Sequence, residues 1–349
     1  MPAPRILIVR LSAVGDVIQS MPIACALRER FPAAFLAWAV EARAGQLLQG
    51  HEALDQLISL PRGWLKSPAG VWRLRRQLHG LRFDVAIEGQ GLTKAAILAW
   101  LSGPPRRIGF GHPWGRELSR WLNTETVDTP GPHIVDRNLQ LLRPLGISSP
   151  AARFLVPECL AARQRAAEMI AAAGLEQGFA IINTGAGWPS KLWPAARFAA
   201  VAAHLGAAWH LPTLVVWAGQ AEQEIGLQIV AAAQGSAQLA PPTTLPELAA
   251  LARRAKLFIS SDTGPLHLAA AVDTPCVGLF GPWPAEVHGP YGPGHIALQK
   301  ARFAGSTRGR RTAPPQLMEA ITVADVCPAC DQILSRTYKH AVGVRQATG

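Results

Sequence analysis

The sequence has no apolar run long enough to cross a lipid bilayer, which takes about 18–20 residues. Its opening segment, MPAPRILIVRL, holds a short apolar run that ends at Arg10 and has no small-residue cleavage site. Such a segment does not match a secretory signal. We therefore expect a protein that stays in the cytoplasm.

Cysteine is scarce, with five residues, an odd number, spread over 349 positions. Without an export signal, this pattern argues against a disulfide framework. Cys327 and Cys330 form a CxxC pair, but no second pair and no preceding strand accompany them. We expect these two residues to pack in a helix or near the surface rather than to bind zinc or exchange electrons.

Two common nucleotide-binding motifs are also missing. No GxGxxG follows the first predicted strand, and no GxxxxGK followed by Ser or Thr occurs anywhere. A dinucleotide-dependent dehydrogenase and a P-loop NTPase therefore both lose support.

Acidic residues are few, and charged residues of either sign make up only 16% of the chain against 49% apolar residues. This balance indicates a globular protein. The 34 Lys and Arg outnumber the 23 Asp and Glu, which gives a net charge of +11. That charge points to acidic partners, namely phosphorylated ligands, anionic lipid or nucleic acid, and composition does not choose among them.

Buried-strand patterns alternate with helical patterns in two successive arrays, which indicates an α/β protein with parallel sheets. The expected strands lie near 5–11, 35–40, 56–60, 84–88 and 107–110, and then near 179–183, 213–217, 257–260 and 276–280. Each array begins with a strong strand. We therefore expect two Rossmann-like domains facing a cleft, with ligands bound outside the carboxyl ends of the strands.

The domain boundary falls in a predicted helix between the two arrays. We expect an N-terminal domain at 1–158, a linker helix at 159–178, a C-terminal domain at 179–325 and a tail at 326–349. A single large doubly wound sheet is the alternative layout.

The most informative stretch runs from Lys256 to Gly281, KLFISSDTGPLHLAAAVDTPCVGLFG. A buried strand ends at Asp262, Thr263 and Gly264, and Pro265 suits the first position of the helix that follows. Backbone N–H groups at such a helix start bind anions, and a diphosphate is the natural guest. His267, in the first turn, can donate to the same oxygens. The alternative is an ordinary connection in which Asp262 and Thr263 only cap the helix.

Other predicted strands of the second array end in polar, glycine-containing turns. Thr184 and Gly185 follow the first of these strands, with Lys191 a few residues beyond, and Glu222 and Glu224 follow the second. Lys191 can offer a point charge to a phosphate, although a lysine is solvated surface by default. Either glutamate can accept from a ribose hydroxyl, as acids past a strand often do.

In the first array, Asp16 stands out. It begins the first helix, just past the first strand, so it faces the carboxyl edge of the sheet. It can act as a general base that deprotonates an acceptor hydroxyl. The alternative is a cap for that helix, and position alone does not separate the two roles.

Three segments together carry a family resemblance: ILIVRLSAVGDVIQSMPIACALRERFP, NTGAGWPSKLWP and SSDTGPLHLAAAVDTPCVGLFGPWPAEVHGPYG. They resemble the signature segments of family-9 glycosyltransferases, the lipopolysaccharide core heptosyltransferases and their relatives. Order and spacing agree from about 5 to 292, and AIEGQGLTKAA resembles the family's acceptor-side segment. The resemblance implies a GT-B fold and inverting transfer from an ADP-sugar, typically ADP-heptose, to a lipopolysaccharide-core or related glycolipid, without a metal or other cofactor.

The resemblance also implies roles for single residues. Asp16 matches the catalytic base, and Lys191 matches a lysine near the donor diphosphate. Glu222 matches an acid near the nucleoside. The donor site is expected to comprise Thr184, Gly185, Lys191, Glu222, Asp262, Thr263, Gly264 and His267, and the acceptor site to include Gly15 and Gln90. The wording before Lys191 and the basic segment 302–316 depart from the core enzymes, which leaves the donor sugar open.

A basic stretch with interleaved tryptophans precedes the fourth strand. It contains Trp64, Leu65, Lys66 and Trp72, and its residues Arg73 and Arg76 are expected to bind the acceptor. Arginine suits phosphates or acidic sugars, and tryptophan suits a lipid interface. We expect peripheral contact with the inner face of the cytoplasmic membrane, to which Arg308, Arg310 and Arg311 can add. The alternative is a solvated helix that packs Leu74, Leu78 and Leu81 on the sheet.

Two rival functions remain at this point. A nucleotide-sugar epimerase of GT-B architecture would use the same donor site but would need no acceptor. A basic nucleic-acid-binding protein would fit the charge, but the sequence shows no nucleic-acid motif and no recognition helix.

Overall fold

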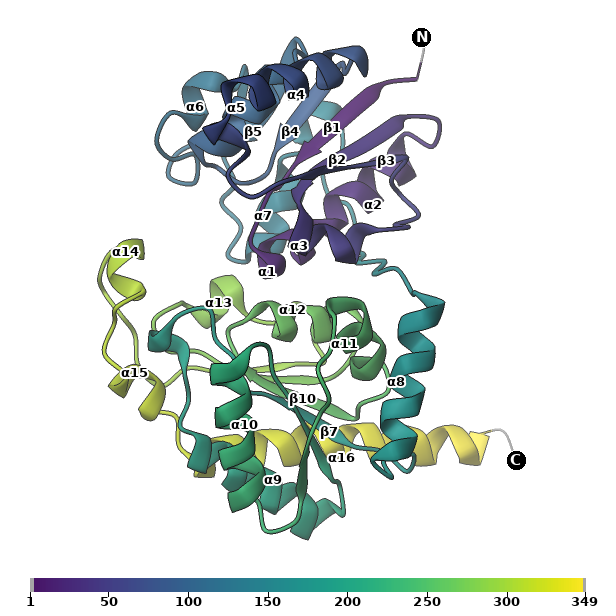
Figure 1. Cartoon of the computed structure of the whole chain (residues 1–349), viewed down its shortest axis with the longest axis vertical. Coiled ribbons are helices and arrows are strands. Elements are labelled where there is room, and N and C mark those ends of the chain that lie inside the picture. Colours follow the sequence, from purple (N-terminus) through teal and green to yellow (C-terminus); the bar gives the residue numbers. More distant parts are fainter. Residues whose placement is uncertain (1–2, 348–349) are drawn as a thin grey trace. The chain divides into compact units, whose positions relative to one another are not determined.

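The computed structural model describes residues 3–347, and the chain divides between Pro157 and Glu158 into two compact units (Figure 1). Each unit contains its own six-stranded sheet, and every strand pairing within the two sheets is parallel. The alternative of one large sheet is therefore wrong. Among the described residues, no helix is long and apolar enough to span a membrane.

The N-terminal unit has the strand order β3-β2-β1-β4-β5-β6. Its strands are β1 (Arg5–Val9), β2 (Phe35–Glu41), β3 (Gln56–Leu60), β4 (Val85–Glu88), β5 (Arg106–Phe110) and β6 (Glu125–Val127). Its helices are α1 (Val14–Ile18), α2 (Met21–Arg30), α3 (Ala42–Gly45), α4 (Pro68–Gly80), α5 (Thr93–Leu101), α6 (Ser119–Leu122) and α7 (Ile134–Gln140), with 3₁₀ turns η1 (Gln46–Leu48), η2 (Trp64–Lys66) and η3 (Arg143–Leu145).

Helices cover both faces of this sheet, as its buried strands require. Alternate residues of β1, β2 and β4 pack with α4 and α5 in one core that includes Leu7, Ala37, Ala86, Leu78 and Leu98. Helices α2 and α7 contact each other on the other face (Figure 1). Helices α1 and α2 are separate, because Pro22 lacks the N–H of a helix interior and fits the first turn of α2 instead.

The C-terminal unit repeats the same topology in the order β12-β11-β10-β7-β8-β9. Its strands are β7 (Ala180–Asn183), β8 (Thr213–Val216), β9 (Ala237–Leu239), β10 (Leu257–Ser261), β11 (Cys276–Leu279) and β12 (Ile296–Leu298). Its helices are α8 (Leu160–Ala172), α9 (Ala195–Trp209), α10 (Gln220–Ala232), α11 (Leu245–Ala252), α12 (Gly264–Ala271), α13 (Ala285–His288), α14 (Thr307–Arg310), α15 (Gln316–Glu319) and α16 (Val323–Ala347), with the 3₁₀ turn η4 (Pro189–Lys191).

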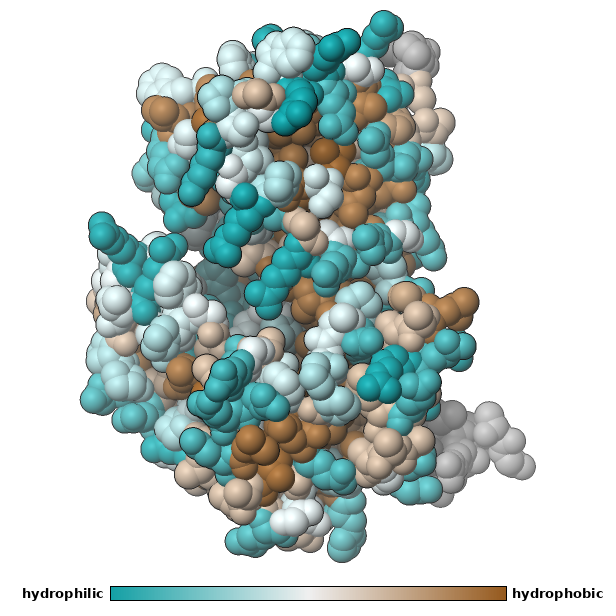
Figure 2. Space-filling view, in the orientation of Figure 1, coloured by the Kyte–Doolittle hydropathy of each residue, from teal (hydrophilic) through white to brown (hydrophobic). Residues whose placement is uncertain are grey.

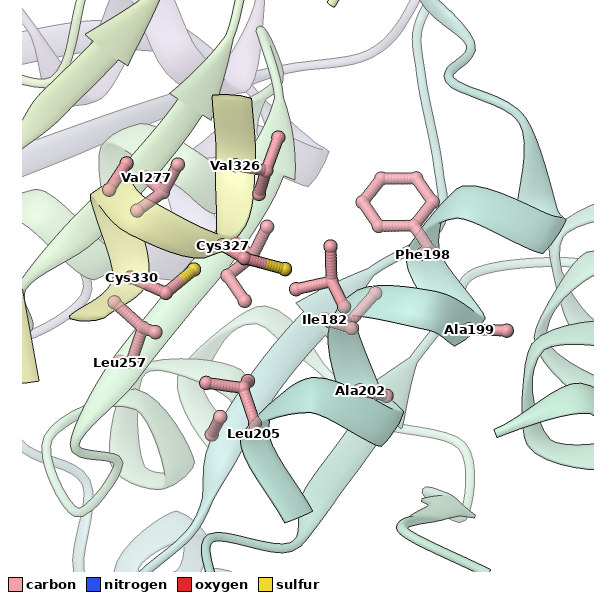
Figure 3. Close-up of a cluster of buried hydrophobic side chains, with 14 of the residues drawn as sticks. Ile182, Phe198, Ala199, Ala202, Leu205, Leu257, Val277, Val326, Cys327 and Cys330 are labelled. Atoms are coloured by element: carbon pink, nitrogen blue, oxygen red, sulfur yellow. The ribbon is translucent and has the colours of Figure 1, made fainter. Parts of the chain in front are cut away.

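The long helix α16 closes one face of the C-terminal sheet. Its residues Val326, Cys327 and Cys330 point into a core that also contains Ile182 and Leu257 from the sheet, with Phe198 and Leu205 of α9 across from them (Figure 3). The stretch expected as a tail thus begins inside a packed helix. Burial raises the pKa of the Cys327 thiol to about 11 and that of Cys330 further still, so both cysteines serve as small apolar side chains here, as expected.

Three strands were not expected: β6, β9 and β12. Each has three residues, lies at or beside a sheet edge and has at least one side chain that is not fully buried. Such segments lack the continuous apolar run that marks a central parallel strand.

Candidate active site

Both sheets reverse their strand order once, between β1 and β4 in the N-terminal unit and between β7 and β10 in the C-terminal unit. Ligands of sheets with this order bind at that point, outside the carboxyl ends of the strands. The residues that follow these four strands include almost all of the predicted donor site and the predicted base. The topology therefore defines one candidate site in each unit.

In the C-terminal unit, three predicted residues form a buried charged cluster. The Lys191 Nζ lies 2.5 Å from Asp262 Oδ2 and also donates to the Asp262 carbonyl at 3.2 Å. The His267 Nε2 lies 3.4 Å from Asp262 Oδ1. Burial raises the pKa of Asp262, but Lys191 and then His267 outweigh it and hold that pKa well below its usual range. The carboxylate is therefore ionised and keeps Lys191 at the end of β10.

The start of α12 is built as the sequence predicted. Thr263 is the N-cap, and its Oγ1 accepts from the Leu266 N–H at 3.4 Å. Asn183, at the end of β7, ties the two strand ends together, because its Nδ2 donates to Ser260 Oγ at 3.0 Å and to Thr263 Oγ1 at 3.4 Å. We did not predict a role for Asn183; an amide at the last position of a buried strand was the available signal.

Trp283, for which we predicted no role, is a further neighbour of Lys191. The Lys191 Nζ lies 4.0 Å from the centre of the Trp283 ring, within the range of a cation–π contact. Trp283 follows β11, the strand next to β10. A tryptophan four residues past a buried strand was the signal that could have found it.

Glu222 lies beside the turn after β7. Its backbone carbonyl accepts from Thr184 Oγ1 at 3.2 Å, and its Oε2 accepts from the Ala218 N–H at 2.8 Å. A Cβ at Gly185 would come within 2.3 Å of the Glu222 carboxyl group, so a larger residue at this position would displace that carboxyl group. Glu224 instead accepts from Gln220 on the exposed side of α10. The two glutamates, which the sequence left open, are thus in different surroundings.

The basic segment 302–316, which departs from the core enzymes, is anchored to the loop that contains Trp188, Ser190 and Lys191. The buried Ser190 hydroxyl donates to the Arg310 carbonyl at 2.8 Å, and the Arg311 guanidinium lies 4.6 Å from the centre of the Trp188 ring. Both partners stand within three residues of Lys191. This segment therefore supports the loop that carries Lys191.

In the N-terminal unit, Asp16 is held by its neighbours in a fixed orientation. Its Oδ1 pairs with Arg10 Nη2 at 2.7 Å, and its Oδ2 accepts from the Ala13 N–H at 2.9 Å. Asp16 therefore does cap α1, yet 39% of its side chain stays exposed, whereas the Arg10 side chain is buried. Capping and a chemical role are compatible at this position.

The turn after β4 lies next to Arg10. The Gly89 carbonyl accepts from Arg10 Nη1, and Gln90 Oε1 accepts from the Leu11 N–H at 3.0 Å. Buried Glu88 shapes the turn by accepting from the N–H groups of Gln90 and Gly91. Predicted acceptor residue Gln90 is thus beside the residues that hold Asp16, and Gly15 lies in α1 itself.

The structure divides the basic tryptophan stretch between the surface and the core. Arg73 and Arg76 lie on the exposed side of α4, while Leu78 is buried and Leu74 packs beside it. Trp64 was expected at a lipid interface, but it is buried in the core, with only 5% of its surface exposed. That part of the prediction was wrong, because the 3₁₀ turn η2 directs this ring under α4 and onto the sheet.

Within the described residues, no three His, Cys, Asp or Glu side chains are grouped so that they could hold a metal ion. Metal independence remains an expectation from the resemblance.

Comparison with known proteins shows which family this chain resembles in sequence. The profile of glycosyltransferase family 9 (heptosyltransferase) matches residues 71–315. Lipopolysaccharide heptosyltransferase 1 of Pseudomonas aeruginosa is 29% identical over 306 residues, which cover 84% of this chain and 83% of that protein.

Solved structures agree in fold. A family 9 glycosyl transferase from Veillonella parvula superposes with a TM-score of 0.82 at 24% identity, covering 96% of this chain and 98% of that one. The Escherichia coli heptosyltransferase WaaC, solved with ADP-2-deoxy-2-fluoro heptose, gives a TM-score of 0.73 at 22% identity, over 94% of this chain and 99% of that one. The predicted GT-B fold is confirmed, and the chain is an enzyme that belongs to glycosyltransferase family 9.

Proposed function

We propose that the enzyme transfers a heptose from ADP-heptose to a hydroxyl of a lipopolysaccharide-core or related anionic glycolipid, with inversion at the anomeric carbon. The observation that carries this proposal is the Lys191–Asp262–His267 cluster at the start of α12. The solved WaaC complex with ADP-2-deoxy-2-fluoro heptose and the lipopolysaccharide heptosyltransferases among the relatives support the choice of donor and acceptor.

The cluster suits a nucleoside diphosphate as leaving group. An ammonium group has three N–H donors, and Asp262 takes two from Lys191, so one is left for a phosphate oxygen. The amino end of α12, with Thr263 and Gly264, adds its positive dipole end. These groups stabilise the charge that develops on the diphosphate as the bond to the sugar breaks. Glu222, beside Gly185, would accept from the nucleoside.

Asp16 supplies the base in this proposal. As the acceptor oxygen forms its bond to the anomeric carbon, the Asp16 carboxylate takes the hydroxyl proton, and the bond from that carbon to the diphosphate oxygen breaks. Arg10 holds the carboxylate in place throughout. Gly15 and Gln90, on the same edge of the N-terminal sheet, and Arg73 and Arg76 of α4 would contact the acceptor.

The test is a thermal-shift panel with ADP, UDP and GDP, followed by transfer assays with ADP-heptose. We expect ADP to stabilise the protein selectively and ADP-heptose to be consumed only when the glycolipid acceptor is present. Consumption of an ADP- or UDP-sugar without acceptor would identify an epimerase instead. Absence of any nucleotide effect, together with steeply salt-dependent binding to generic DNA, would indicate a nucleic-acid-binding protein.

The proposed place of action is the inner face of the cytoplasmic membrane, because the acceptor is a lipid. Contact would be peripheral. The charge of the chain, +11, favours an anionic surface.

A further inference from the structure

Five of the nine large hydrophobic side chains that are exposed in the described part of the chain lie in one region of the N-terminal unit. This region consists of η2, α4, α5 and α6 with the residue before it. Its exposed members are Leu65, Trp72, Trp100, Leu118 and Trp121. Trp121 is 79% exposed and Trp72 is 61% exposed. A soluble surface normally scatters such side chains singly, so a group of three tryptophans indicates an interaction site.

The members of this group lie on neighbouring elements. Helix α4 contacts α5, and α5 contacts α6; α4 and α5 cover the same face of the sheet (Figure 1). The Leu118 N–H donates to Thr93 Oγ1 at 3.2 Å, which fixes the start of α6 beside the start of α5. We call Trp72, Trp100, Leu118 and Trp121 the tryptophan face.

Lys and Arg predominate around this face, in which Glu117 beside Leu118 is also exposed. Residues 61–80 contain five Lys or Arg and no Asp or Glu, and Arg73, Arg75 and Arg76 are exposed on α4. The Arg76 guanidinium lies 5.8 Å from the centre of the Trp72 ring. Arg116 and Arg120 are exposed on either side of Leu118. Over α4 to α6, Figure 2 shows strongly hydrophilic side chains interspersed with pale and brown ones.

The combination of exposed tryptophans with surrounding Lys and Arg indicates what binds to the tryptophan face. Tryptophan has an apolar body and a polar N–H, which suits the boundary between headgroups and acyl chains, and each nearby Lys or Arg is attracted to anionic lipid. A second copy of this chain would bring the same cations against these, and like charges repel. We propose that the tryptophan face docks the N-terminal unit on an anionic lipid bilayer. This inference rests on the proposed function, in which the acceptor is linked to a lipid.

The tryptophan face also adjoins the predicted acceptor edge of the same unit. The Arg116 N–H donates to the Gly91 carbonyl at 3.0 Å, directly after Gln90, and the Leu118 contact to Thr93 is two residues further along. A bilayer on this face would therefore hold lipid-linked acceptors close to the turn after β4.

The experiment compares the wild type with the Trp100→Ala/Trp121→Ala double variant of the full-length protein. A Leu160→Ala/Leu227→Ala variant, which removes two exposed leucines of the C-terminal unit, is the matched control. Binding is measured by co-sedimentation with vesicles of phosphatidylcholine, with and without phosphatidylglycerol. Transfer is measured with the same acceptor embedded in vesicles and with its soluble, delipidated form. Thermal melting and the ADP shift verify that each variant folds.

We expect wild type and control to bind the anionic vesicles, less so at high salt, and the tryptophan variant to bind about tenfold more weakly. Its transfer should fall on vesicles and stay normal on the soluble acceptor. Vesicle binding equal to wild type would overturn the proposal, as would a wild-type dimer that the variant dissociates in light scattering. Failure of the proposed function looks different, because transfer would then be absent for wild type with either acceptor while vesicle binding persisted.

Discussion

The two units share a strand order, and each places a carboxylate–cation pair where that order reverses, but the pairs differ in which partner is accessible. In the N-terminal unit, the Asp16 side chain is 39% exposed and its partner Arg10 is 7% exposed. In the C-terminal unit, the Asp262 side chain is 9% exposed and its partner Lys191 is 14% exposed. The first pair presents its acid, and the second buries it.

This difference indicates what each pair can do. An exposed carboxylate held by a buried cation can meet a substrate hydroxyl and take its proton. A buried, ionised carboxylate cannot reach substrate, but it fixes a lysine whose remaining donor can serve an anion. Under the proposed function, one topology would support proton abstraction in one unit and phosphate binding in the other, and the side chains alone would make the difference.

The largest expected effect comes from neutralising the exposed acid. Asp16→Asn keeps the size of the side chain and removes the base, so kcat should fall by about 10²–10⁴. Melting temperature should fall somewhat, because the substitution leaves buried Arg10 without its carboxylate partner. ADP affinity should remain at the wild-type value, since the nucleotide is assigned to the other unit. Steady-state kinetics and ADP titration check this. Glu52→Gln, another exposed acid of the same unit, is the control, and near-normal turnover by Asp16→Asn would refute the base assignment.

Breaking the buried Lys191–Asp262 pair should lower the stability of the protein as well as its affinity for ADP. Lys191→Met leaves Asp262 ionised beside His267 without its main partner, and removal of one member of a buried pair costs about 3–5 kcal/mol. The free energy of unfolding should fall by that amount, and ADP should bind more weakly. The double variant Lys191→Met/Asp262→Asn should recover part of the stability but none of the ADP affinity. Equal stability of wild type and Lys191→Met in urea unfolding would show that the pair is not coupled.

The central strands and the residues at their carboxyl ends could be predicted from the sequence, because central parallel strands have a recognisable apolar pattern. Apolar runs such as Leu257–Ile259 can only be buried on both faces, and the polar residues that follow them must lie at the carboxyl edge. The same reasoning predicted that Asp16 lies at the carboxyl edge of its sheet.

Other features depend on tertiary neighbours. The Lys191–Asp262 contact joins residues 71 positions apart and exists because β7 lies beside β10, an order that the sequence does not state. Trp64 and Trp72 occur in one basic stretch, yet one is buried and the other exposed. That outcome is set by a 3₁₀ turn before α4, and no periodicity signals such a turn.

The units should also differ in which buried groups make them sensitive to acid. Burial lowers the pKa of His51 to about 4, and its Nε2 has no partner while its Nδ1 accepts from the Ala53 N–H. Between about pH 6.5 and 4, the unfolded chain binds a proton there that the folded chain does not. The N-terminal unit should therefore lose stability as pH falls through that range, by at most about 3 kcal/mol.

The measurement is urea unfolding at several pH values, with hydrogen exchange to follow each unit separately. His51→Asn should flatten the pH dependence of the N-terminal unit, whereas His79→Asn, at an exposed position of the same unit, should not. Buried Glu88 has a pKa raised by burial and acts in the opposite sense, which is why the comparison is made between variants. An unchanged slope in His51→Asn would assign the acid sensitivity elsewhere. In the C-terminal unit, burial also lowers the pKa of His295, which acts in the same sense as His51. Asp262 adds a loss of stability at lower pH, where the unfolded chain takes up a proton that folded Asp262 does not.

The smallest effect tests the nucleoside end of the donor site. Glu222→Gln should weaken ADP binding about tenfold, because it removes the charge of an acceptor beside Gly185, and a hydrogen bond to a charged group is worth about 1.5–3 kcal/mol. Glu224→Gln, two residues along the same helix on its exposed side, should leave ADP affinity unchanged. Calorimetric titration of both variants distinguishes them. Equal losses would mean that the general charge of α10, rather than the Glu222 carboxylate beside Gly185, attracts the nucleotide.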